Sequence, residues 1–216
     1  MNKQEIIKLL EEKNFDALIS GARGDLKGVF RRLIGLAYDK EDVMCWRAIE
    51  ALGLLAGEAA KTDCEGIRNL AQRILWMMRE ESGNNPWSAP EMLGEIVRNS
   101  PDNFADIAPV IMSFHDEQML RRGVLRAAVR IGESRPELLC CADDFPGMYL
   151  NDPDSVVRYY AMLLAGQLKL RRYIPEINKL TESKETVKIY NAGEFTFKAV
   201  DEEAQRVYSK LQNEEN

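Results

Sequence analysis

Histidine is almost absent from this sequence, since His115 is the only one among 216 residues. It stands in the run Phe114-His115-Asp116-Glu117, without a Ser or Cys nucleophile in a recognisable elbow elsewhere in the chain. A catalytic triad needs such a nucleophile beside the base. We therefore expect His115 to cap or precede a helix, and the sequence offers no catalytic motif.

Cysteine is also scarce. Cys45, Cys64, Cys140 and Cys141 have no metal-ligand spacing, and adjacent cysteines can hardly form a disulfide with each other without strain. A free cysteine packs like a small hydrophobic residue, so we expect buried, reduced thiols and no cofactor. A redox or metal role is the alternative.

Long hydrophobic runs are missing as well. No run of about 18 apolar residues occurs, which excludes a membrane-spanning helix of the usual length. Residues 1–12 interleave Lys and Glu with Ile and Leu, a pattern that predicts an amphipathic helix and not a signal peptide. We expect no membrane partner and a cytoplasmic protein.

Basic residues are not in excess: 29 Lys and Arg stand against 35 Asp and Glu, a net charge of -6. Nucleic-acid binding needs a basic face that displaces counterions from phosphate, so the composition argues against it. The 45% of hydrophobic residues nevertheless predicts a folded globular protein.

What the sequence does contain is a repeat. An Ala followed five positions later by Gly recurs four times, and the successive alanines are 41, 38 and 34 residues apart. This drifting period is near that of HEAT-type helical hairpins, and small residues at this spacing let neighbouring helices approach closely. The four copies are Ala48 to Gly53, Ala89 to Gly94, Ala127 to Gly132 and Ala161 to Gly166.

The last copy is the most specific. Asp152 to Ala161 reads DPDSVVRYYA and is followed by Leu164-Ala-Gly166. This stretch resembles the D-x-x-x-V-R-x-x-A-x-x-x-L-G signature of the HEAT-like repeats also found in phycocyanobilin lyase subunits. The resemblance implies a bacterial, all-α superhelix (a HEAT/armadillo-like solenoid) of about five helical hairpins that holds a partner. It does not carry over the lyase reaction.

The short loops favour one domain over residues 1–216, with the repeats at about 25–183. Period-two alternation around Asn191-Ala-Gly193 predicts a β-hairpin at 187–200, followed by a capping helix. Periodicity leaves open whether this hairpin covers the concave face or only ends the stack. The expected helices are about 3–21, 25–38, 41–56, 64–81, 88–99, 103–114, 117–131, 136–142, 153–169, 173–182 and 201–213.

The repeat pattern breaks between residues 82 and 95. Pro86 and Pro90 exclude the helical turn that the other copies have here, so we expect this helix to begin near Ser88 and to leave a gap in the solenoid wall. Trp87, at the junction between loop and helix, is our candidate anchor for a partner.

Glu91 and Glu95 follow on one face of this helix. Two carboxylates at this spacing can bind a divalent metal or act as acid and base. They can also offset the positive helix end and pair with a neighbouring arginine, and we favour this structural interpretation because a metal site normally needs more ligands.

Arg122, Arg126 and Arg130 form the only dense basic stripe. Their guanidinium groups can bind a carboxylate or phosphate of a ligand. Our preferred interpretation is that they neutralise the acidic face of the preceding repeat, where Glu91 and Glu95 lie.

The leading functional hypothesis is a non-enzymatic scaffold that binds a protein partner. The alternatives are a lyase or chaperone that carries a tetrapyrrole-like cofactor, and a metal or redox protein; a small-molecule ligand is left open. The candidate partner-binding residues are Trp87, Glu91, Glu95, His115, Arg122, Arg126 and Arg130.

Overall fold

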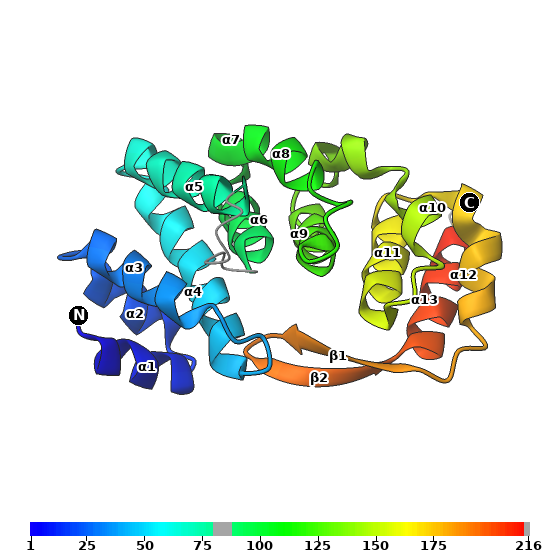
Figure 1. The fold of residues 1–216 in the computed structure, drawn as a ribbon, viewed down its shortest axis with the longest axis horizontal. Coiled ribbons are helices and arrows are strands. Elements are labelled where there is room, and N and C mark those ends of the chain that lie inside the picture. The colour runs from blue at the N-terminus through cyan, green and yellow to red at the C-terminus, as the bar shows by residue number, and fades with distance from the viewer. Residues whose placement is uncertain (80–87, 214–216) are drawn as a thin grey trace.

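The protein is a row of helices with a small β-hairpin, and the computed structural model describes residues 1–79 and 88–213 (Figure 1). Three short 3₁₀ segments, Ala105–Ile107, Pro136–Ala142 and Arg171–Tyr173, join some of the helices. The elements are α1 (Lys3–Glu11), α2 (Phe15–Ala22), α3 (Leu26–Leu36), α4 (Val43–Ala60), α5 (Cys64–Arg79), α6 (Ala89–Asn99), α7 (Pro101–Phe104), α8 (Ala108–Met112), α9 (Arg121–Gly132), α10 (Phe145–Tyr149), α11 (Ser155–Gln167), α12 (Ile174–Leu180), β1 (Thr186–Asn191), β2 (Glu194–Ala199) and α13 (Val200–Asn213).

The four Ala-to-Gly copies lie on α4, α6, α9 and α11, which pack one against the next along the molecule. A Cβ added at Gly53 would lie 2.5 Å from the Cβ of Glu95 on the next helix, and one at Gly94 would lie 2.6 Å from the Cβ of Ala127. No real side chain tolerates such distances, so glycine at these positions allows the close approach of the helices. The predicted role of the repeat is confirmed.

Other helices form a second layer. In Figure 1, α5, α7 and α8 lie along the upper edge of the row, while α12 and α13 close its right-hand end and α1 to α3 its left-hand end. Hydrophobic side chains from both layers are buried in one continuous cluster that runs from Ile6 in α1 to Leu211 in α13. No helix of the described chain is both long and apolar enough to cross a membrane.

The hairpin forms where the sequence predicts it. β1 and β2 pair antiparallel from Thr186 with Ala199 to Asn191 with Glu194. The two turn residues, Ala192 and Gly193, have φ of 48° and 86°, the left-handed backbone that a two-residue turn between twisted strands requires.

The hairpin lies across the row of helices along its lower edge in Figure 1. The ring of Tyr190 stacks on that of Trp46 in α4, with centroids 5.9 Å apart, and β1 also contacts α11. Arg47 in α4 donates through Nε to the carbonyl of Gly193 across 2.7 Å. The hairpin therefore covers the amino-terminal halves of α4, α9 and α11 and does more than end the stack.

Several element boundaries differ from the predictions. The helix expected at 3–21 is interrupted because Lys13 has a φ of 54° and the side chain of Asn14 caps α2 by accepting from the backbone of Ala17. The helix expected at 103–114 is divided into α7, a 3₁₀ turn and α8, with Pro109 in the first turn of α8. α9 begins at Arg121 instead of residue 117, and α10 was not predicted.

The late start of α6 is confirmed. This helix begins at Ala89, directly after Ser88, and Pro90 lies in its first turn. The buried hydroxyl of Ser88 donates to the carbonyl of Ala37, which ties the beginning of α6 to the end of α3.

Candidate functional site

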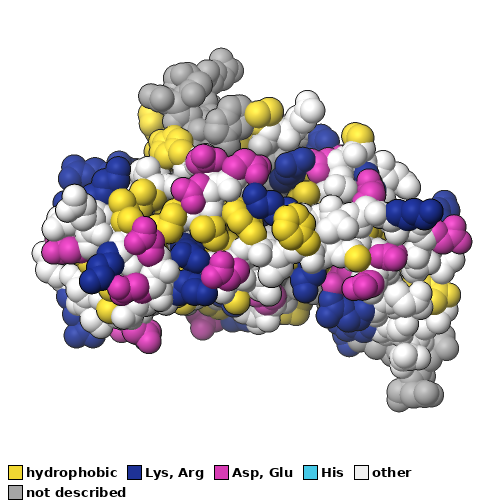
Figure 2. Space-filling model, turned by 90° about the horizontal axis from the view of Figure 1, so that it is seen from below, with side chains coloured by type: hydrophobic (Ala, Val, Ile, Leu, Met, Phe, Trp, Pro, Cys, Tyr) yellow, Lys and Arg dark blue, Asp and Glu magenta, His cyan; other side chains and the backbone are white. Residues whose placement is uncertain are grey.

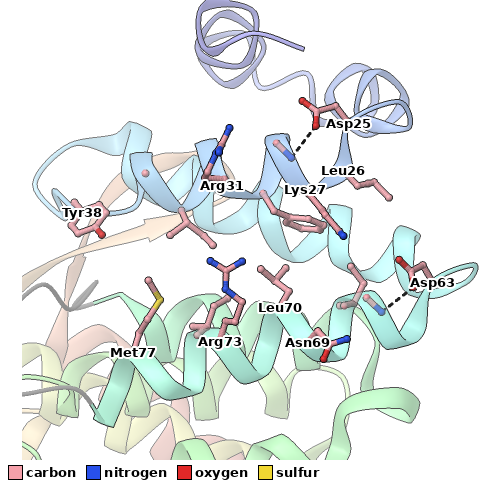
Figure 3. Close-up of a pocket in the computed structure, with 17 residues that line it drawn as sticks. Asp25, Leu26, Lys27, Arg31, Tyr38, Asp63, Asn69, Leu70, Arg73 and Met77 are labelled. Atoms are coloured by element: carbon pink, nitrogen blue, oxygen red, sulfur yellow. Dashed lines mark hydrogen bonds between the residues drawn. The ribbon is translucent and has the colours of Figure 1, made fainter.

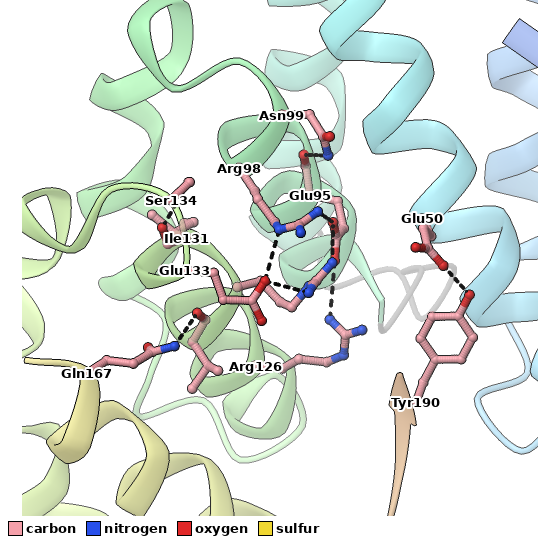
Figure 4. A network of polar contacts seen from close by, with 12 residues as sticks. Glu50, Glu95, Arg98, Asn99, Arg126, Ile131, Glu133, Ser134, Gln167 and Tyr190 are labelled. Atoms are coloured by element: carbon pink, nitrogen blue, oxygen red, sulfur yellow. Dashed lines mark hydrogen bonds and ion pairs between the residues drawn. The ribbon is translucent and has the colours of Figure 1, made fainter. Parts of the chain in front are cut away.

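The predicted acidic and basic residues meet in a buried ion network between α6 and α9 (Figure 4). Glu95 is 1% exposed, and its Oε1 accepts from Nε of Arg130 across 2.7 Å. Nη1 of Arg126 and Nη1 of Arg98 lie 3.5 and 3.6 Å from the same carboxylate. Glu133 joins Arg98 and Arg130 at the edge of the network.

The charges of this network keep Glu95 ionised. Burial opposes ionisation of Glu95, but the nearby arginines, Arg126 first, outweigh it, and the pKa of Glu95 is lowered. Burial likewise disfavours the charged form of Arg130, yet its pKa is raised because it bonds to Glu95. The structural interpretation is confirmed for Glu95: the arginine stripe neutralises the acid of the preceding repeat.

Glu91 is held differently. It is 2% exposed, and its Oε1 lies 2.5 Å from Nζ of Lys40, a residue of the loop before α4. Within the described chain its Oε2 has no hydrogen-bond partner. That oxygen rests against Gly123 in the first turn of α9, where any Cβ would clash with it, so a negative charge sits beside the positive end of a helix.

Arg126 connects the ion network to the hairpin. It is 4% exposed, and its guanidinium carbon lies 4.8 Å from the ring centroid of Trp46 and 5.9 Å from that of Tyr190. At such distances an arginine is attracted by the ring faces. Its Nε is buried and has no hydrogen-bond partner among the residues described.

A cavity of about 200 Å³ opens between β1 and the amino-terminal halves of the covered helices. Three of the residues predicted to bind a partner line it, namely Glu91, Arg122 and Arg126. Arg122 is 61% exposed in its side chain and pairs with Asp154. Figure 2 shows the molecule from the hairpin side, where basic and acidic side chains are mixed with hydrophobic ones.

Of the other four predicted residues, Glu95 and Arg130 lie in the ion network, and His115 is not among the residues that line the cavity. The ring of His115 packs 4.5 Å from that of Phe145, and its Nδ1 lies 2.7 Å from the hydroxyl of Tyr149. His115 therefore belongs to an aromatic cluster near α10. Trp87 lies outside the described residues.

A larger groove lies between α3 and α5, with a volume of about 830 Å³ (Figure 3). Apolar side chains form its floor, among them Phe30, Ile34, Leu70, Ile74 and Met77. The helices α3 and α5 do not pack closely against each other, because each of them packs on α4.

The rim of this groove is basic. Figure 3 shows Arg73 reaching from α5 toward α3 and Lys27 from α3 toward α5, with Arg31 as a third cation. Across the two described ranges, none of the three makes an ion pair or side-chain hydrogen bond. The nearby Asp25 and Asp63 are already engaged, since each caps its helix by accepting from a glycine N–H.

Sequence reasoning missed this groove, and it missed Lys40, Trp46, Tyr160 and Tyr190 at the cavity. A usable signal existed for the groove: Lys27 and Arg31 are four residues apart on α3 without an acidic partner at helical spacing beyond them. Nothing local marks Lys40 as the partner of Glu91, which is 51 residues away.

Metal binding finds no support in the described chain. It contains no group of three or more His, Cys, Asp and Glu side chains arranged to hold an ion.

Cys45 is buried, whereas Cys140 and Cys141 are exposed, which corrects the expectation that all the thiols are buried. Cys140 and Cys141 lie within the 3₁₀ segment Pro136–Ala142, which turns Leu139 and Ala142 to the core and leaves the two thiols exposed.

Comparisons with known proteins give a fold and no activity. No family model matches the chain. An "Uncharacterized protein" of Archaeoglobus fulgidus is 30% identical over 110 residues, which make up 49% of this chain and 57% of that protein. The chain thus spans little more than half the length of this relative.

Two solved structures are similar in shape. The crystal structure of an engineered protein has a TM-score of 0.59 at 16% identity, covering 89% of this chain and 50% of that one. An archaeal HEAT-like repeats protein from Thermococcus onnurineus NA1 is 17% identical, with a TM-score of 0.45 over 98% of this chain and 80% of that one. Neither a lyase type nor a bacterial origin is confirmed. The predicted fold class is confirmed: the chain is an all-α row of stacked helices, with a two-stranded sheet before its last helix.

Proposed function

We propose that this protein is a non-enzymatic scaffold that holds an acidic, amphipathic helix of a partner protein in the groove between α3 and α5. The observation that carries the proposal is an apolar floor between two walls whose cations pair with no residue that the structure describes. An amphipathic helix buries its apolar stripe in such a groove and leaves its polar flanks to the rim.

Charge selects the kind of helix. Lys27, Arg31 and Arg73 line the groove, and the carboxylates nearest to them are engaged as helix caps. Acidic residues flanking the apolar stripe of the partner would meet these cations, which favours correct partners and accelerates association.

The shape of the groove agrees with this occupant. Two helices that diverge over a third leave an elongated slot, and Figure 3 shows Tyr38 and Met77 together at one end of it. Tyr38 is 49% exposed, a large exposure for an aromatic ring that has no binding role.

The arginine stripe is less suited to this task. Glu95 and Arg126 are buried and bonded to residues of the same chain, so a partner could reach them only by breaking those bonds. We therefore place the partner at the groove, and the sequence-based hypothesis for Trp87 and the stripe stays a prediction.

The test is selection from a display library of about 20-residue helical peptides, roughly 30 Å long. We expect the retained peptides to carry apolar residues at a spacing of three and four with Asp and Glu beside them. Peptides with basic flanks, or a selection without any binder, would contradict the proposal.

A further inference from the structure

The cavity under the hairpin has a lining that the proposed scaffold function does not use. Residues of β1, α4, α6, α9 and α11 line it, and none of them lines the groove between α3 and α5. Its volume of about 200 Å³ is below the roughly 300–1,000 Å³ of drug-sized pockets. Only a small molecule can enter it.

Two buried polar atoms at this cavity lack partners in the part of the chain that the structure describes. Oε2 of Glu91 is an acceptor without a donor, and Nε of Arg126 is a donor without an acceptor. Buried groups of this kind are rare in folded proteins, and leaving one unsatisfied is unfavourable. A bound molecule that offers both a donor and an acceptor would satisfy the two atoms at once.

The charges exclude simple ions. An anion without a proton donor would be repelled by the carboxylate of Glu91. A cation without an acceptor would be repelled by Arg126 and by Lys40, which already bonds to Glu91. A molecule that carries charges of both signs avoids both repulsions.

The walls of the cavity favour a ligand that also carries an apolar group. Trp46, Tyr160 and Tyr190 line the cavity with aromatic rings, and Val156 and Ile189 add aliphatic surface. These side chains would pack against a hydrocarbon or aromatic group of the ligand, while the polar atoms fix its orientation.

We propose that the cavity binds a small zwitterion of the α-amino acid class that carries an apolar side chain. Its ammonium group bonds to Glu91 and its carboxylate to Arg126, and its side chain packs against the aromatic rings. Lys188 and Arg122 also belong to the lining of the cavity.

The experiment is a thermal-shift screen of free protein amino acids with the full chain, followed by calorimetric titration of those that raise the Tm. Each binding amino acid is compared with the amine that lacks its carboxylate and the acid that lacks its ammonium group. We expect both analogues to bind at least roughly thirtyfold more weakly, because each leaves one buried charge unpaired.

Three variants locate the site. Glu91→Gln keeps the shape of the side chain and should weaken binding by a similar factor. Val156→Phe fills the cavity without removing a polar group and should abolish binding even if Glu91→Gln fails to fold. Glu202→Gln makes the same change of charge on an exposed residue of α13, outside the cavity lining, and should bind as the wild type does.

Several outcomes would overturn the inference. If no amino acid binds, water alone satisfies the two atoms. Equal binding by an analogue with a single charge would also contradict the inference. So would unchanged binding by Val156→Phe. Charge reversal at Lys27 and Arg73 in the groove should leave amino-acid binding unchanged, so the scaffold proposal and this one can fail separately.

Discussion

Glu95 and Arg130 belong to neighbouring helices of the stack, and a hydrogen bond of 2.7 Å joins the buried carboxylate of one to the guanidinium of the other. Replacing Glu95 by Gln removes the buried negative charge that pairs with both Arg126 and Arg130. Breaking a buried ion pair from one side is strongly destabilising, so we expect the free energy of unfolding in urea to fall by about 3–5 kcal/mol.

Glu133 provides the matched control, since it also pairs with Arg130 and with Arg98 but its side chain is 37% exposed. Glu133→Gln should lower the free energy of unfolding by less than about 1 kcal/mol. Equal effects of the two substitutions would contradict the assignment of Glu95 as the centre of the network.

The carboxylate of Glu95 also makes the stability of the fold depend on pH. The pKa of Glu95 in the folded protein is lowered from its usual value of 4.5, so the unfolded chain binds its proton more tightly. The stabilisation from Glu95 is therefore complete above about pH 4.5 and is lost as the pH falls through the lower folded-state pKa. Urea unfolding between pH 6 and 3 should show a smaller loss for Glu95→Gln than for the wild type.

Substitutions at two glycines allow the effect of close packing on stability to be measured separately from the effect of helix propensity. Gly94→Ala places a Cβ 2.6 Å from that of Ala127 and should lower the free energy of unfolding by about 1–3 kcal/mol, as overpacking does. Gly35, inside α3, has no atom within 4 Å of an added Cβ. Gly35→Ala should stabilise the protein by up to about 1 kcal/mol through helix propensity alone. Chemical denaturation measures both, and a stabilising Gly94→Ala would refute the packing role.

Arg47 fastens the hairpin to the helices. It is buried, and it donates to the carbonyls of Gly193, Leu10 and Glu11. In Arg47→Ala the amide hydrogens of residues 186–199 should exchange faster, and stability should fall by about 1.5–3 kcal/mol for the lost charged hydrogen bonds. Lys188→Ala, which removes a half-exposed ion pair of the same hairpin, should leave the exchange nearly unchanged.

Cys45 should resist alkylation in the folded protein. Burial, together with the negative charge of Glu91, raises its pKa to about 12, so almost no thiolate forms at pH 8. Iodoacetamide should label the exposed Cys140 and Cys141 and reach Cys45 only after unfolding, as peptide mapping by mass spectrometry can detect. Rapid labelling of Cys45 in folded protein would mean that α4 opens locally.

The parts of the structure that the sequence predicts are those with local or periodic signals. Gly53 and Gly94 recur at the repeat spacing, and stacking follows from that recurrence. The pairing of Arg130 with Glu95 follows from it too, because a residue of one repeat faces the corresponding region of the next. The turn at Ala192 and Gly193 is marked by its own residues.

Contacts between distant segments have no such signal. The hydroxyl of Tyr190 donates to Glu50, 140 residues earlier, and no pattern in either segment indicates it. The position of the hairpin, and with it the cavity, therefore could not be predicted. The groove arises because α3 and α5 both pack on α4 and diverge from each other, which depends on the whole set of packed side chains.

The central claim is that the basic groove holds an acidic helix, and its most direct test is the affinity of a selected peptide for two charge-reversed proteins. Lys27→Glu/Arg73→Glu changes the groove, whereas Lys179→Glu/Lys210→Glu makes the same change in net charge on exposed residues of α12 and α13. We predict that fluorescence anisotropy shows at least about tenfold weaker binding for the first protein and unchanged binding for the second. Equal affinity for both proteins would contradict the account.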